Sequence, residues 1–158
     1  MRFSNQTYYF LEKQRIIIAL IITILIFIPI WNKKLTEIQN ETQENIAAMN
    51  RSQIAAFYEK NTFITSTEEL YIAEKLKNQN YDYSIKLGYK TVFNYAIPHY
   101  GYLKSYVSGV FIKTPPDKNF EFKTILCEAK FSGKNQPKPP TDKNGVVACG
   151  NNMRKIGT

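Results

Sequence analysis

The sequence predicts an α+β fold in which one long N-terminal helix packs on a four-stranded antiparallel sheet. An apolar run near the N-terminus continues into a segment with helical periodicity, and from Tyr81 onward apolar residues alternate with polar ones instead. A chain of 158 residues has room for one domain and an anchor, but not for two large domains. A meander of strands leaves one apolar face of the sheet uncovered, and the amphipathic helix is the available cover.

The apolar run predicts a membrane anchor over residues 8–31. Ile16–Trp31 alone would span about 24 Å as a helix, which is less than the hydrocarbon core of a bilayer. The run is long enough when residues 8–11 are included and the side chains of Lys13 and Arg15 extend towards the headgroups. A cleaved signal peptide is the alternative, but no small-residue cleavage site follows the run. We therefore expect the anchor to be retained.

Basic residues on both sides of the anchor set its expected orientation. Three precede the apolar run and two follow it, namely Arg2, Lys13, Arg15, Lys33 and Lys34. This excess predicts a single-pass inner membrane protein with a cytoplasmic N-terminus, and it makes residues 32–158 a periplasmic or extracellular domain. The formal net charge of +8 allows contact with polyanions such as DNA or polysaccharide, although the lysines are scattered along the chain.

Two cysteines, Cys127 and Cys149, lie far apart in segments that read as strands. This usage suits a disulfide in an oxidising compartment, which would close a loop near the C-terminus. Such a bond would contribute about 3 kcal/mol to stability in the chain-entropy model. Two buried free thiols are the alternative interpretation.

The segment after the anchor predicts an amphipathic helix that continues to about Asn61. Its mostly apolar stripe has members three or four residues apart: Leu35, Ile38, Thr42, Ile46, Met49, Gln53 and Phe57. This stripe either packs on the chain's own sheet, which we favour, or contacts a partner helix. Pro29 interrupts the otherwise unbroken helical sequence and predicts a kink near the outer membrane boundary.

Beyond the helix, local signals predict a short helix and then the sheet. Ser66 and Glu69 form a capping-box pattern that predicts a helix up to about Lys77. Four strands are expected at residues 81–87, 91–98, 105–113 and 121–129. The Pro- and Lys-rich residues 131–145 predict an exposed loop without strands, and the polar tail from Gly150 is expected to fray.

Aromatic and basic residues are interleaved in the first half of the predicted sheet and form a candidate binding surface. Its members are Lys86, Lys90, Tyr100, Tyr102 and Lys104, which could stack on bases or sugars and hold phosphates. The alternative is that the tyrosines simply suit half-buried strands.

Nothing in the sequence indicates an enzyme. His99 is the single histidine and has no Cys, Asp or Glu at ligand spacing, so we expect no metal site. The serines have no evident base, and no phosphate-binding loop is present, so we expect no cofactor.

Five stretches of the sequence resemble cyanobacterial type IV pilin-like proteins of the G and H group. They are "NIAAMNRSQIAAFYEKNTFITSTEEL", "NYDYSI", "NYAIP", "LKSYVSGVFI" and "ILCEA", and the resemblance extends over residues 8–149. It implies a pilin fold, with a helix that is half in the membrane and half packed on the sheet.

The resemblance also implies roles for residues near the N-terminus. Aligned without gaps, the pilin pattern places its Glu on Glu12 and its Pro on Pro29, so that Tyr8 becomes the first mature residue and residues 1–7 a leader. Prepilin peptidases read a Gly before the cut, whereas this chain has Thr7. Pilins carry Leu or Val where this chain has Lys13 and Arg15, and a cation is costly in a dry core of packed helices. Glu12 is therefore interpreted either as the assembly residue or as an interfacial charge.

The function implied by the resemblance is structural. We expect a minor pilin or pilin-like component of a type IV pilus system, serving filament assembly, adhesion, motility or uptake. Its partners would be other pilin subunits, the assembly machinery and prepilin peptidase. Two alternatives remain: a membrane-anchored module that displays a surface for DNA or polysaccharide without entering a filament, and a pseudopilin of a secretion system.

Overall fold

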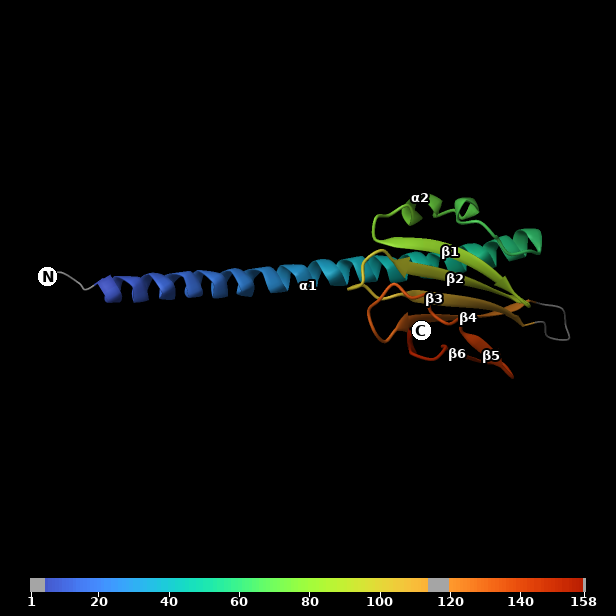
Figure 1. Ribbon diagram of the computed structural model, residues 1–158. Helices are drawn as coiled ribbons and strands as arrows, with labels where there is room; N and C mark the ends of the chain where they lie inside the picture. The colour runs from blue at the N-terminus through green and yellow to red at the C-terminus, as the bar shows by residue number, and fades with distance from the viewer. Residues whose placement is uncertain (1–4, 114–119, 158) are drawn as a thin grey trace. The chain divides into compact units, whose positions relative to one another are not determined.

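The computed structural model describes residues 5–113 and 120–157. In this part of the chain all helical elements precede the strands (Figure 1). The helical elements come first: α1 (Asn5–Lys60), a 3-10 turn η1 (Thr67–Glu69) and α2 (Ala73–Leu76). The strands follow: β1 (Tyr81–Gly88), β2 (Thr91–Pro98), β3 (Tyr106–Lys113), β4 (Glu121–Ala129), β5 (Thr141–Lys143), β6 (Val146–Ala148) and β7 (Met153–Ile156). The chain forms two compact units, one ending at Glu37 and the other beginning at Ile38.

The first unit is the N-terminal part of α1, and its apolar side chains from Tyr9 to Trp31 are exposed. Among the described residues, α1 is the one helix long and apolar enough to cross a membrane. The helix continues through Pro29, so the predicted kink there stays a prediction. Residues 1–4 of the predicted leader lie outside the described residues, as do the side chains of Thr7 and Tyr8.

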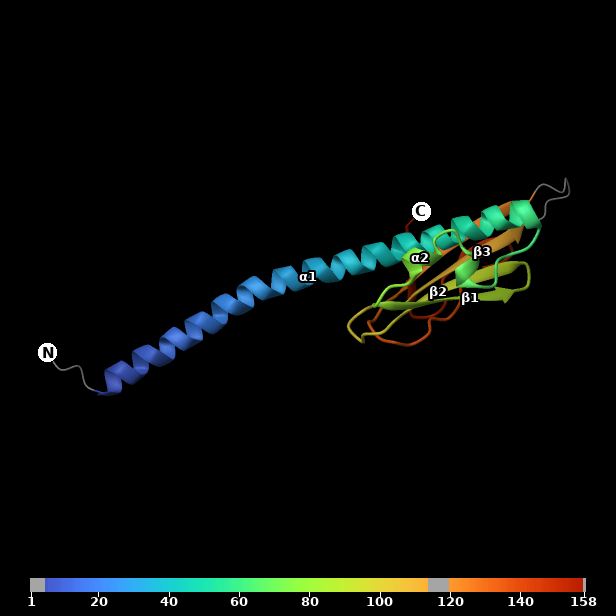
Figure 2. The ribbon, with the colours of Figure 1, turned by 90° about the horizontal axis from the view of Figure 1, so that it is seen from above.

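The second unit begins with the remainder of α1, which covers one face of the sheet (Figure 2). The predicted stripe is buried at five positions, Thr42, Ile46, Met49, Gln53 and Phe57. Hydrogen bonds join this segment directly to the strands, as from Asn45 Nδ2 to the hydroxyl of Tyr83 at 3.3 Å. From Ile38 onward the stripe therefore packs on the chain's own sheet.

The main sheet has five antiparallel strands in the order β1-β2-β3-β4-β7. The α+β fold and the four-strand meander predicted from the sequence are confirmed, and the tail adds a fifth strand. The tail was expected to fray, but β7 pairs with β4 and buries Met153 against the sheet. Without β7, one edge of β4 would be unpaired. Backbone hydrogen bonds to this edge order the tail, although most of its side chains are polar.

The Pro- and Lys-rich segment also differs from the prediction, because it contains the β5–β6 hairpin. Asn144 and Gly145 join the two strands with φ values of +53° and +81°. Positive φ at both central residues is the requirement of a tight type I′ hairpin, and Asn-Gly meets it best. Each strand has only three residues, too few to give a recognisable alternation.

A second core lies on the face of the sheet opposite α1. Its buried members are Tyr95, Val107, Phe111, Ile125, Cys127 and Met153. The segment between the cysteines packs on this face, because Val147 and Cys149 contact the cluster and Pro137 and Pro140 are buried. The predicted exposed loop is thus partly a cover for the sheet.

Gly109 is expected to be intolerant of a side chain because the second core approaches it closely. A Cβ atom at this position would lie 2.7 Å from the Phe111 ring and 3.0 Å from Pro140 Cγ. We predict that Gly109→Val lowers the free energy of unfolding by about 2 kcal/mol through overpacking. Denaturant unfolding followed by circular dichroism measures this. Gly101→Ala is the control, since nothing lies within 4 Å of its Cβ position, and an equal loss in both variants would contradict the packing argument.

The segment after Ser66 departs from the predicted capping box. Ser66 Oγ accepts from the amide of Glu68 at 3.4 Å instead of that of Glu69, and the helical residues are split between η1 and α2. Leu70 has an extended backbone between the two pieces, with φ −73° and ψ 142°. Leu70, Ile72 and Leu76 are all buried, so packing of these side chains overrides the local preference for one continuous helix.

Candidate functional site

The residues of the predicted binding surface fall into two groups at opposite ends of the sheet. Tyr100 and Tyr102 lie in the loop after β2, with stacked rings 5.4 Å apart and both side chains exposed. Lys86 and Lys90 lie towards the β1–β2 turn, each over a tyrosine ring. The eight residues of β2 place Lys90 roughly 24 Å from the loop after β2, and Lys86 lies between these two ends, opposite Phe93. The five residues therefore do not form one contiguous surface.

Lys104, the fifth predicted residue, is part of a buried charge network. Its ammonium lies 3.0 Å from Oε2 of Glu128, a carboxylate that is only 2% exposed. Arg154 Nε donates to the same oxygen at 2.6 Å. The hydroxyl of Tyr106 donates to Oε1 of Glu128 at 3.1 Å. A buried carboxylate held by two cations and a hydroxyl is well satisfied, so Lys104 serves the fold first.

Burial also fixes the protonation of two tyrosines beside this network. It raises the pKa of Tyr106 and of Tyr81 well above the ordinary value of 10.0. Both hydroxyls therefore stay protonated and act as donors, Tyr81 to the carbonyl of Lys104 at 3.0 Å. The Tyr81 bond joins the β2–β3 loop to β1, and the Tyr106 bond joins β3 to β4.

His99 directly follows β2, and its exposed side chain contacts β1 and the residues just before β1. Its Nε2 atom is 2.8 Å from Oδ1 of Asp82, and its Nδ1 atom is 2.9 Å from the carbonyl of Gln79. The side-chain hydrogen bond with Asp82 is the largest cause that raises the pKa of His99 above 6.5, followed by the bond with Gln79. The protonated imidazole donates to both partners.

We predict that this contact makes local stability depend on pH. Because the pKa of His99 is raised in the folded protein, its contribution is present below about pH 6.5 and is lost as the pH rises through the folded pKa. An NMR titration of the His99 ring measures that pKa, and Asp82→Asn is expected to lower it. An unchanged pKa in that variant would contradict the assignment. The effect on global stability is small because both side chains are exposed.

The cysteines form the predicted disulfide, with Cα atoms 5.8 Å apart. Cys127 is fully buried in β4, and Cys149 follows β6. The bond therefore fastens the segment between them onto the second core, and the described residues include no free cysteine.

A cavity of about 270 Å³ lies in the surface between the segment that follows β4 and the turn that enters β7. One wall is the loop from Phe131 to Lys138, and the other is the turn from Asn151 to Met153 that enters β7. The lining contains four side-chain amides, one aromatic ring and one lysine, contributed by Asn135, Gln136, Asn151, Asn152, Phe131 and Lys138. We name it the amide pocket.

Backbone contacts hold the walls of the amide pocket together. Lys130 N donates to the carbonyl of Asn152 at 2.9 Å, and Ser105 Oγ donates to that of Asn135 at 2.8 Å. Gly150 packs so closely that a Cβ atom there would lie 2.8 Å from Cβ of Lys138. No motif in the sequence singles out these residues. The four amides and the phenylalanine of this lining lie within 22 residues of sequence, which is only a weak indication of a binding site. They surround one cavity only in the folded chain.

Glu12 is exposed on the apolar part of α1, and its neighbour Lys13 lies over the ring of Tyr9 at 5.0 Å. The assembly and processing roles of Thr7, Tyr8 and Glu12 stay predictions. Across the described part of the chain, no three His, Cys, Asp or Glu side chains are grouped as metal ligands.

Comparison with known proteins agrees with this architecture. A search of curated proteins and of solved structures found no match. The family model described as "Type IV pilin-like G and H" matches residues 39–150. This match covers most of the chain, from the part of α1 that packs on the sheet to the residue after the second cysteine. The chain therefore belongs to the type IV pilin-like G and H family.

Proposed function

We propose that the protein is a structural subunit, a minor pilin or pilin-like component of a type IV pilus system. The observation that carries the proposal is the double use of α1, a single helix from Asn5 to Lys60. Its apolar N-terminal part suits a bilayer, whereas its later part completes the core of a pilin-like domain. A helix used in this way lets a subunit leave the membrane and pack with its neighbours while its sheet faces outward.

The proposed location follows from the same features. Residues 8–31 anchor the protein in the inner membrane with the N-terminus in the cytoplasm, and residues 32–158 form the exported domain. The Cys127–Cys149 disulfide supports an oxidising compartment for that domain. Partners would be other pilin subunits and the assembly machinery.

Three charged residues near the start of α1 favour a minor role over that of a major subunit. Glu12, Lys13 and Arg15 would all enter the helical core of a filament, where an unpaired cation is costly. A subunit present in few copies, or one at a filament end, faces that cost at few contacts. A pseudopilin of a secretion system would share this property.

The mass and N-terminal residue of protein purified from membranes test the proposal. A chain beginning at Tyr8 would support processing by a prepilin peptidase and an assembly role for Glu12. A chain that begins at Met1 and is absent from sheared filaments would contradict the filament role.

The second candidate is a display module that stays in the membrane. The exposed Tyr100–Tyr102 stack and the net charge of +8 favour it, because aromatic rings and cations together suit polyanionic chains. DNA affinity that falls steeply with salt would support this role, whereas no binding at low salt would remove it.

A further inference from the structure

The amide pocket has the chemical features of a sugar site. Asparagine and glutamine side chains each present donors and an acceptor, which matches hydroxyl groups that both donate and accept. Phe131 stands at the edge with 75% of its surface exposed, so its ring face is free to pack against the C–H groups of a sugar ring. The volume of about 270 Å³ lies just below the range of pockets for drug-sized ligands and suits one ring with part of its neighbour.

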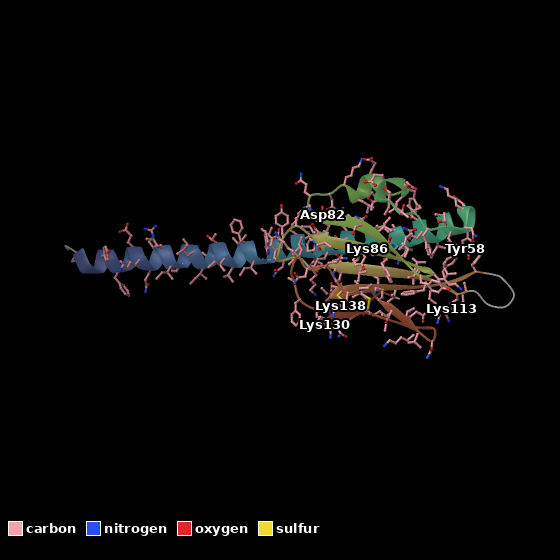
Figure 3. The ribbon with its side chains drawn as sticks, turned by 45° about the vertical axis from the view of Figure 1, so that its right-hand side comes forward. Tyr58, Asp82, Lys86, Lys113, Lys130 and Lys138 are labelled. Atoms are coloured by element: carbon pink, nitrogen blue, oxygen red, sulfur yellow. A yellow bond between two sulfur atoms is a disulfide. The ribbon has the colours of Figure 1, made fainter. Side chains whose placement is uncertain are left out.

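Charge narrows the class of sugar. The lining includes Lys138 and no carboxylate, and Lys130 and Lys134 lie in the same loop. Figure 3 shows Lys130 and Lys138 at the same end of the domain. The one buried acid nearby, Glu128, is already paired with Lys104 and Arg154. The pocket therefore favours a sugar that carries a negative charge.

Contacts within the protein hold the walls of the amide pocket in place without a ligand. The carbonyl of Asn135 accepts from Ser105 Oγ at 2.8 Å, and the backbone of Asn152 is held by Lys130 N at 2.9 Å. The disulfide and the close approach of Gly150 to Lys138 restrain the two walls. Restraint of this kind reduces the ordering cost of binding.

We propose that the amide pocket binds a uronic-acid residue of an acidic polysaccharide. Phe131 packs on the sugar ring, Asn151 and Asn152 bond its hydroxyls, and Lys138 pairs with its carboxylate. Single-stranded nucleic acid fits less well, because such sites use several aromatic rings along a basic groove, whereas this lining has one ring and one lysine. The inference does not depend on filament assembly, since a displayed subunit would carry the same pocket.

Calorimetry with the full-length protein in detergent micelles tests the proposal, using trigalacturonate as probe and a neutral maltotriose and a short single-stranded oligonucleotide as comparisons. We expect trigalacturonate to bind at least tenfold more tightly than either comparison. Phe131→Ala and Lys138→Gln are each expected to weaken it at least tenfold. The matched controls Tyr89→Ala and Lys143→Gln remove an exposed ring and an exposed lysine elsewhere, and should stay within twofold.

Three results would overturn the proposal: no binding of trigalacturonate, equal affinity in the pocket variants and the wild type, or an oligonucleotide affinity equal to that for the sugar. Thermal unfolding checks that each variant is folded. If Phe131→Ala fails to fold, Asn152→Gly replaces it, because the φ of +63° at this position suits glycine and the substitution removes only the amide. Its binding should then also fall, and unchanged binding would count against the site.

Discussion

Glu128→Leu is expected to lower the free energy of unfolding by about 4 kcal/mol, because it breaks a buried ion-pair network by removing its centre. The change leaves the ammonium of Lys104, the guanidinium of Arg154 and the hydroxyl of Tyr106 without their common acceptor. Arg154 can turn to solvent, but Tyr106 is fully buried and Lys104 mostly so. The shift of the denaturant midpoint, followed by circular dichroism with the disulfide intact, measures the loss.

The controls separate charge from shape and position. Glu128→Gln keeps the size of the side chain and part of its hydrogen bonding, so a smaller loss than with leucine is expected. Glu121→Leu makes the same substitution at an exposed position of the same strand and should change stability by no more than about 0.5 kcal/mol. Comparable losses at Glu121 and Glu128 would show that the network contributes nothing specific.

The parts of the fold that follow from a repeating pattern were predictable. The runs of β-branched and aromatic residues at 91–98 and 121–129 predict strands whose bounds match β2 and β4. The stripe from Thr42 to Phe57 predicts the covering face of α1, because its members recur every three or four residues on one side of the helix. The two cysteines predict their bond because they lie far apart in predicted strands of a domain that is expected to be exported.

The parts that follow from tertiary contacts were not predictable. β7 has only Met153 buried, so its order comes from the open edge of β4 and not from its own side chains. The candidate binding surface was predicted as one patch because its residues, from Lys86 to Lys104, are close in sequence. Closeness in sequence does not show at which end of a strand each residue lies. The amide pocket was missed because its walls, from Phe131 and from Asn151 onward, meet only after the disulfide loop folds back.

Asn94 illustrates the same limit within a strand that was predicted well. It lies between the apolar Val92 and Ala96 on the face towards α1, and all three are fully buried. An amide at an inward position is a signal of a buried partner, but the sequence does not name that partner. The structure supplies it from α1, where Asn50 lies 44 residues away in sequence.

Asn94→Leu is accordingly expected to lower the free energy of unfolding by about 3 kcal/mol. Asn94 Nδ2 donates to Oδ1 of Asn50 at 2.9 Å and lies 3.5 Å from Ser108 Oγ, and its Oδ1 accepts from Gln53 at 3.5 Å. Leucine has a similar volume, so the loss would come from hydrogen-bonding groups left buried without partners, at about 1–3 kcal/mol for each. Denaturant unfolding of the full-length protein gives the value.

Removing the partners together distinguishes this explanation from simple misfit. The triple variant Asn50→Leu, Asn94→Leu and Ser108→Ala eliminates the mutually bonded groups, while Gln53 keeps its two bonds to the backbone of Ile64 at 2.9 and 3.0 Å. We expect the triple variant to be more stable than the sum of the three single changes predicts, because groups in one network are not additive. Strict additivity would mean that each residue acts through its own packing, and that the polar pairs across the α1–sheet interface do not act as a unit.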